Sequence, residues 1–148
     1  MVNKVKTPCI GVCSTGIGDS VCRGCKRYTH EVVDWNAYTE AQRVSISLRL
    51  DALIRQVLEA RVEIFDEPLL RQQLQMQNVR HHPEQSPFAW LFEILKVGAG
   101  QIRNLEAFGA RLLPEYAHMT LPEFKALVDE DFFVLSQVHY ERYFSKVY

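Results

Sequence analysis

All four cysteines of this 148-residue chain lie near its start, at positions 9, 13, 22 and 25. The segment around them is irregular, because four of the seven glycines of the chain fall within residues 1–28. Such a segment buries little apolar surface, so hydrophobic burial does little to offset the conformational entropy that it loses on folding. Bound metal supplies the missing stability in small cysteine-rich modules. The cysteines therefore predict that a metal ion or cluster holds this segment together.

The spacing of the cysteines fits one tetrahedral site. Cys9 and Cys13 are separated by three residues, and Cys22 and Cys25 by Arg23 and Gly24. Four thiolates form a closed site around zinc, with Zn–S bonds of about 2.3 Å. The same ligands also suit iron or an iron–sulfur cluster. We expect Zn²⁺, because the short spacing is typical of a zinc knuckle, and we keep the iron–sulfur cluster as the alternative.

Other interpretations of the cysteines fit less well. Unrelated buried thiols are disfavoured by two close pairs in glycine-rich loops, and a thioredoxin-like pair at Cys22 and Cys25 requires a βαβ pattern that the sequence lacks. The start of the chain does not resemble a secretory signal, and no apolar stretch is long enough to span a bilayer. We expect a cytoplasmic protein whose thiols stay reduced, with no membrane contact.

The same segment resembles a known family. The matching residues are Pro8, Cys9, Ile10, Gly11, Val12, Cys13, Cys22, Gly24, Cys25, Arg27, Glu31 and Trp35, with a weaker likeness extending to Arg43. They resemble the YdhL-like bacterial family of unknown function, over roughly residues 7–58. Tyr28 departs from the pattern, since the family usually has threonine directly after its arginine. The resemblance implies a four-cysteine ligand set, and the family is described as iron–sulfur proteins from its cysteine pattern.

The remainder of the chain predicts an all-α fold of about five to six helices behind the cysteine loop. Apolar residues recur at helical spacing, and capping motifs stand at Thr39 and Thr120. The expected helices are a short turn from Thr29 or His30, then about 40–62, about 67–78, one from Pro87 to the glycines at 98 and 100, about 101–113, and one from 121 to 143 with an interruption near Asp131. We expect a metal-binding module over 1–62 and a helical region over 63–148, either separate or sharing one core.

Positive charge concentrates beside the cysteines. Residues 1–30 carry a net charge of +4, whereas the whole chain carries −1. We define the basic knuckle as Arg23, Lys26, Arg27 and Tyr28, and expect it to contact a protein or RNA partner. The alternative is that these charges only offset the charge of the thiolates. Trp35 is expected to cover the metal loop.

Two classes of function follow from this pattern. The first is a metal-stapled binding or adaptor module for a protein or nucleic-acid partner, and the second is an iron–sulfur electron-transfer or redox-sensing protein. An enzyme is disfavoured, because four cysteine ligands leave a zinc ion no open position and no catalytic motif is present. His30 lies close to Cys25 in sequence and is expected to be a solvated bystander.

Overall fold

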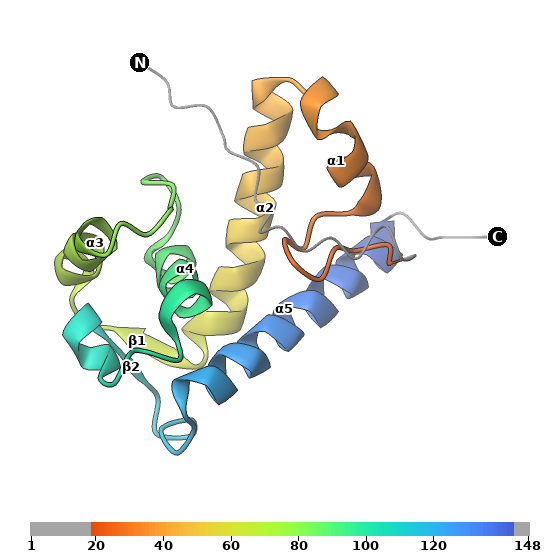
Figure 1. Cartoon of the computed structure of the whole chain (residues 1–148). Helices are drawn as coiled ribbons and strands as arrows, with labels where there is room; N and C mark the ends of the chain where they lie inside the picture. The colour runs from red at the N-terminus through yellow and green to blue at the C-terminus, as the bar shows by residue number, and fades with distance from the viewer. Residues whose placement is uncertain (1–18, 144–148) are drawn as a thin grey trace. The chain divides into compact units, whose positions relative to one another are not determined.

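The computed structural model describes residues 19–143, so Cys9 and Cys13 lie outside the described residues. The described part is mostly helical, as the sequence predicts (Figure 1). Its α-helices are α1 (Thr29–Asp34), α2 (Glu40–Glu59), α3 (Glu67–Met76), α4 (Pro87–Gly98) and α5 (Leu121–Tyr143), and its 3-10 helices are η2 (Trp35–Ala37) and η3 (Leu105–Phe108). Two short strands, β1 (Val62–Ile64) and β2 (Ala110–Leu112), form an antiparallel sheet. None of the described helices combines the length and apolar character needed to cross a membrane.

The predicted capping boxes at the two longest helices are confirmed. Before α2, the Thr39 amide donates to Gln42 Oε1 at 2.8 Å, and the Gln42 amide donates to Thr39 Oγ1 at 3.2 Å. Before α5, the Thr120 amide donates to Glu123 Oε1 at 3.0 Å, and the Glu123 amide donates to Thr120 Oγ1 at 3.2 Å. Each box gives partners to amides that a helix start leaves without an intrahelical acceptor.

The two middle helices begin where their caps and prolines predict. Asp66 Oδ1 accepts from the amide of Leu69 at 3.1 Å, and Ser86 Oγ accepts from the amide of Ala89 at 3.4 Å. Pro68 and Pro87 stand in the first turns of α3 and α4, where the missing N–H costs no intrahelical hydrogen bond.

The predicted helix over 101–113 is wrong. The chain instead forms η3 and then β2, whose Leu112 pairs with Val62 of β1. The turn between them depends on Gly109, which has a φ of 80° and whose carbonyl oxygen accepts from the amides of Phe65 and Asp66 at 2.9 and 3.1 Å. Left-handed backbone ends a helix, and pairing with a strand far earlier in the sequence gives β2 its hydrogen bonds.

Two smaller expectations also need correction. Helix α5 runs without interruption through Asp131, because this acidic stretch contains neither glycine nor proline. Helix α2 ends at Glu59 rather than near residue 62, since Val62 already belongs to β1.

The chain divides into two compact units. The described residues of the first unit are 19–53 and 131–143, and the second unit is Ile54–Glu130. The buried hydrophobic side chains of the first unit are Val21, Cys22, Cys25, Tyr28, Trp35, Ile46, Leu50, Leu53, Phe132 and Phe133. The core of the second unit includes Leu58, Leu70, Leu74, Trp90, Leu91, Ile94, Leu95, Ala110, Phe124 and Val128.

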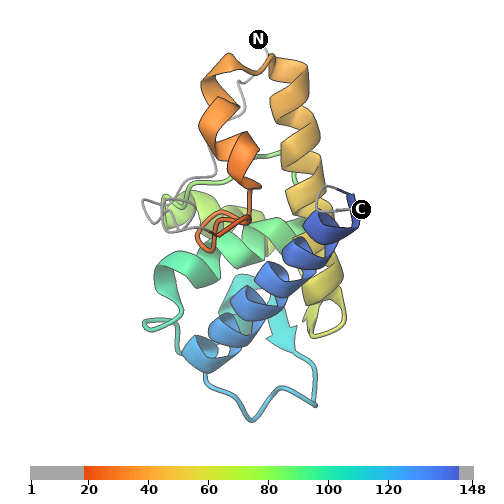
Figure 2. The same ribbon diagram turned by 90° about the vertical axis from the view of Figure 1, so that its right-hand side faces the viewer.

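In the first unit, α1 folds back beside the N-terminal half of α2, with η2 forming the turn between them (Figures 1 and 2). Residues 19–28, which precede α1, contact the C-terminal half of α5 through Tyr28, whose ring lies 5.2 Å from that of Tyr140. The cysteine segment therefore packs on a helix that is distant in sequence, and this arrangement positions the candidate site.

Candidate metal centre

Cys22 and Cys25 lie on one tight loop, which we call the knuckle and define as residues 22–27. The amide of Cys22 donates to the carbonyl oxygen of Arg27 at 2.9 Å. The amide of Lys26 donates to the carbonyl oxygen of Cys22 at 2.7 Å. Just outside the loop, Val21 and Tyr28 form an antiparallel β-bridge. Lys26 has a φ of 67°, a left-handed conformation that reverses the chain directly after the second cysteine. Both cysteines are buried and reduced.

The Cys25 sulfur accepts a hydrogen bond from Arg27, whose Nε lies 3.2 Å away. Burial raises the pKa of the Cys25 thiol, while the hydrogen bond and positive charge of Arg27 oppose that rise. Negative charge on Cys22 raises the pKa of Cys25 further, which indicates that the two sulfurs are electrostatically coupled. Two coupled thiols beside a guanidinium suit a cation that keeps both as thiolates.

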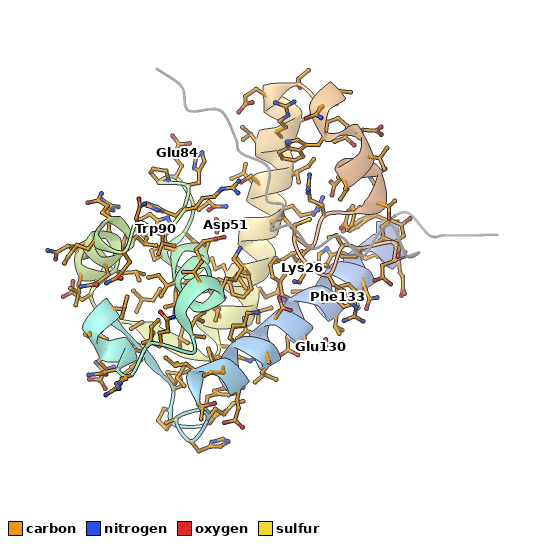
Figure 3. The ribbon with its side chains drawn as sticks, viewed as in Figure 1. Lys26, Asp51, Glu84, Trp90, Glu130 and Phe133 are labelled. Atoms are coloured by element: carbon orange, nitrogen blue, oxygen red, sulfur yellow. The ribbon has the colours of Figure 1, made fainter. Side chains whose placement is uncertain are left out.

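Lys26, which sequence analysis included in the basic knuckle expected to contact a partner, is buried. Its ammonium donates to the carbonyl oxygens of Arg23 and Gly24, and lies 5.4 Å from the centre of the Phe132 ring. Lys26 and Phe133 are seen where the knuckle passes α5 (Figure 3). The Lys26 ammonium thus hydrogen-bonds carbonyl oxygens of its own loop and stabilises the turn.

Within the basic knuckle, Lys26, Arg27 and Tyr28 are buried and Arg23 is exposed. The Arg23 guanidinium lies 4.1 Å from the centre of the Phe133 ring and 3.8 Å from Asp19. Arg23 is therefore the member of the set that faces solvent.

Trp35 is buried and contacts the knuckle through Arg27. The guanidinium of Arg27 lies 4.9 Å from the centre of the indole ring, and that of Arg43 lies 5.7 Å from it. The Arg43 side chain also donates to the carbonyl oxygen of Trp35 at 3.1 Å. Trp35 thus packs against the Arg27 guanidinium.

Sequence analysis missed an ion pair behind the knuckle. Glu31 of α1 is bound by Arg49 of α2 in a bidentate arrangement, with N–O distances of 2.5 and 2.7 Å. Glu31 also accepts from the amide of Tyr28 at 2.8 Å, and the Arg49 guanidinium stacks 3.9 Å from the centre of the Tyr28 ring. Glu31 and Arg49 are 18 residues apart, so no local pattern joins them.

An apolar cluster includes the two residues that flank the knuckle. Val21, Tyr28 and Phe133 form this cluster, and Tyr140 packs against it. Because Val21 and Tyr28 flank the loop, the two ends of the knuckle are fixed to the core of the first unit.

Two of the four predicted ligands therefore share one loop, and the other two, Cys9 and Cys13, lie outside the described residues. His30 is exposed and its ring lies 5.9 Å from that of Tyr28. Over residues 19–143, no three histidine, cysteine or carboxylate side chains group closely enough to hold a metal. A complete site at the knuckle would therefore need ligands from outside residues 19–143.

The cysteine segment matches a known protein family. Residues 7–53 match the model of DUF1289, a family described as proteins of unknown function. The matched segment contains all four cysteines together with Arg27, Glu31 and Arg49. It ends at Leu53, where the first unit also ends its N-terminal part. The match confirms that this region resembles a family of unknown function. Neither curated proteins nor solved structures gave a match.

Proposed function

We propose that Cys9, Cys13, Cys22 and Cys25 together bind one zinc ion, and that the stapled unit serves as an adaptor for a protein or nucleic-acid partner. The observation that carries this proposal is the knuckle, which holds two buried cysteines on one loop beside a guanidinium. Thiolates are the form that binds zinc, and a nearby cation favours thiolates. When bound, the ion would supply stability to a segment that has little core of its own.

The packing of the knuckle supports a structural role for the metal. Val21 and Tyr28 stand at the two ends of the loop and enter the apolar cluster with Phe133. A metal that fixes the loop therefore also fixes these two side chains in the core. Four cysteine ligands leave zinc no open coordination position, so a binding module agrees with this ligand set better than an enzyme does.

The resemblance to the YdhL-like family favours a second candidate, an iron–sulfur protein for electron transfer or redox sensing. The same four thiolates suit either metal centre. Anaerobic purification followed by metal analysis and absorption spectroscopy separates them. Zinc at one equivalent in a colourless protein is the expected result, whereas iron and sulfide in a brown protein would replace zinc by a cluster.

The ligand assignment is tested by comparing Cys22→Ser with His30→Ala. The first removes a buried sulfur from the knuckle, and the second removes an exposed ring. We expect Cys22→Ser to lose bound metal and His30→Ala to retain it. Equal metal loss in the two variants would place His30 among the ligands and contradict the all-cysteine site.

The structural role is tested by removing the metal while each unit is followed separately. The two tryptophans allow this, because Trp35 lies in the first unit and Trp90 in the second. With Trp90→Phe and Trp35→Phe variants, a strong chelator should change the fluorescence of Trp35 and leave that of Trp90 nearly unchanged. A simultaneous change at both would show that the second unit also depends on the metal.

The proposed partner contact now centres on Arg23, because it is the solvent-facing member of the basic knuckle. A contact between Arg23 and a single-stranded phosphate should contribute a slope of about −0.7 to the dependence of log affinity on log salt. We expect Arg23→Gln to reduce the slope for mixed RNA by about that amount while metal content stays constant. If the wild-type protein binds no RNA at low salt, the partner is a protein or the adaptor role is wrong. Pull-down with an acidic peptide library distinguishes these two outcomes.

A further inference from the structure

The charge on Arg27 requires a partner that the described carboxylates do not supply. Arg27 is 3% exposed, and a guanidinium stays protonated at all physiological pH values. None of the ion pairs formed among residues 19–143 includes Arg27. Its contacts there are the Cys25 sulfur, which accepts from Nε at 3.2 Å, and the face of Trp35. A buried cation without an opposing charge is strongly disfavoured.

We propose that the Nε–H···Sγ hydrogen bond makes Arg27 a positioning residue for the metal centre, in which the metal-bound Cys25 sulfur would carry the negative charge that faces the guanidinium. This inference rests on the proposed four-cysteine site and names which of its thiolates is stabilised from outside the coordination shell. The guanidinium also lies 4.9 Å from the centre of the Trp35 ring, and this contact restricts the side chain while its Nε–H bonds the sulfur.

The hydrogen bond has a defined chemical consequence. A hydrogen-bond donor on a metal-bound thiolate would stabilise the negative charge on the Cys25 sulfur and so make it a poorer nucleophile. The same donor offsets part of the excess negative charge of a tetrathiolate centre. Groups that hold metal ligands from a second layer of contacts typically change metal affinity by about 10–100-fold when removed.

Arg43 provides a matched control on the same indole ring. Its guanidinium lies 5.7 Å from the centre of the Trp35 ring, but its hydrogen bonds go to the carbonyl oxygens of Trp35 and Asn36. A substitution of Arg43 therefore disturbs the tryptophan without removing a donor from sulfur. Arg27→Met and Arg43→Met delete the same group from the two positions and retain an apolar side chain of similar length.

The test uses the full chain loaded with Co²⁺ as a spectroscopic substitute, and competition with a chromophoric chelator. We expect Arg27→Met to bind Co²⁺ and Zn²⁺ about 10–100-fold more weakly than wild type, and Arg43→Met to stay within about threefold of it. We also expect the sulfur-to-cobalt charge-transfer band to move to lower energy in Arg27→Met alone. Far-UV circular dichroism of each variant confirms that the helices persist.

If Arg27→Met fails to fold, Arg27→Lys still tests the inference. Lysine retains the charge and a donor, so its affinity should fall between those of wild type and Arg27→Met. Equal effects of Arg27→Met and Arg43→Met, or an unchanged cobalt spectrum in Arg27→Lys and Arg27→Met, would overturn the inference. Wild-type protein that binds no metal would instead overturn the proposed function, so the two failures are distinguishable.

Discussion

The Glu31–Arg49 ion pair is expected to be a major source of stability in the first unit. Its two charged groups are largely removed from water, with 7% of the Glu31 side chain and 23% of the Arg49 side chain exposed. Glu31→Gln removes the negative charge but keeps an oxygen for the Tyr28 amide. It leaves a guanidinium whose Nε already has no hydrogen-bond partner among the described residues. Removing one member of a buried pair costs about 3 kcal/mol or more.

The assay is urea unfolding followed by Trp35 fluorescence in a Trp90→Phe background. With a urea dependence of about 1.5 kcal/mol per molar, a loss of about 3 kcal/mol lowers the midpoint by about 2 M. Arg49→Met should cost a similar amount, and the double variant should cost less than the sum of the two. The expected coupling free energy is about 2 kcal/mol, which exceeds the error of such a cycle.

Arg55→Met is the control for an exposed ion pair on the same helix: Arg55 lies in the part of α2 that belongs to the second unit and pairs with Glu59 at 3.4 Å. That pair is more than half exposed on both sides, so its loss should have little effect on the midpoint. A coupling free energy below about 0.5 kcal/mol between Glu31 and Arg49 would refute the reasoning, and so would a Glu31→Gln effect no larger than that of Arg55→Met.

Three further predictions follow from single residues. Gly109→Ala should destabilise the second unit by more than about 2 kcal/mol, because the φ of Gly109 is 80° and a Cβ there would lie 2.2 Å from the Asp66 carbonyl oxygen. Urea unfolding followed by Trp90 fluorescence measures this. Gly100→Ala is the control and should change the free energy of unfolding by less than about 0.5 kcal/mol, because a Cβ at Gly100 meets nothing within 4 Å. Both Lys26→Ala and Lys26→Gly remove the ammonium, but the glycine variant should be about 1 kcal/mol more stable in urea unfolding because position 26 is left-handed, and equal stability would contradict this. The capping hydrogen bonds lower the pKa of Glu123 below its ordinary value of 4.5. The stability that the ionised carboxylate contributes is therefore present above pH 4.5 and is lost as the pH falls through the lowered pKa. The difference in melting temperature between wild type and Glu123→Gln should shrink as the pH falls below 4.5, and a difference that stays constant would contradict the assignment.

Elements with local signals could be predicted from the sequence. Capping boxes at Thr39 and Thr120, and caps at Asp66 and Ser86, each lie within three residues of the amides that they serve. Helical periodicity likewise depends on neighbouring turns. The starts of α2, α3, α4 and α5 were therefore predicted correctly, and the spacing of two residues predicted that Cys22 and Cys25 share one tight loop.

The remaining interactions join segments that are distant in sequence, so they could not be predicted from local patterns. Strand β2 replaces a predicted helix because Leu112 pairs with Val62 of β1. No local sequence pattern predicts this pairing. The charges beside the cysteines predicted a basic surface for a partner. In the fold, Phe132 of α5 lies 5.4 Å from the buried Lys26 ammonium, and Phe133 lies 4.1 Å from the Arg23 guanidinium. Burial is a property of what packs against a residue from elsewhere in the chain. For that reason the sequence located the cysteine loop, whereas the fold decided which of its cations face the sulfur and which face solvent.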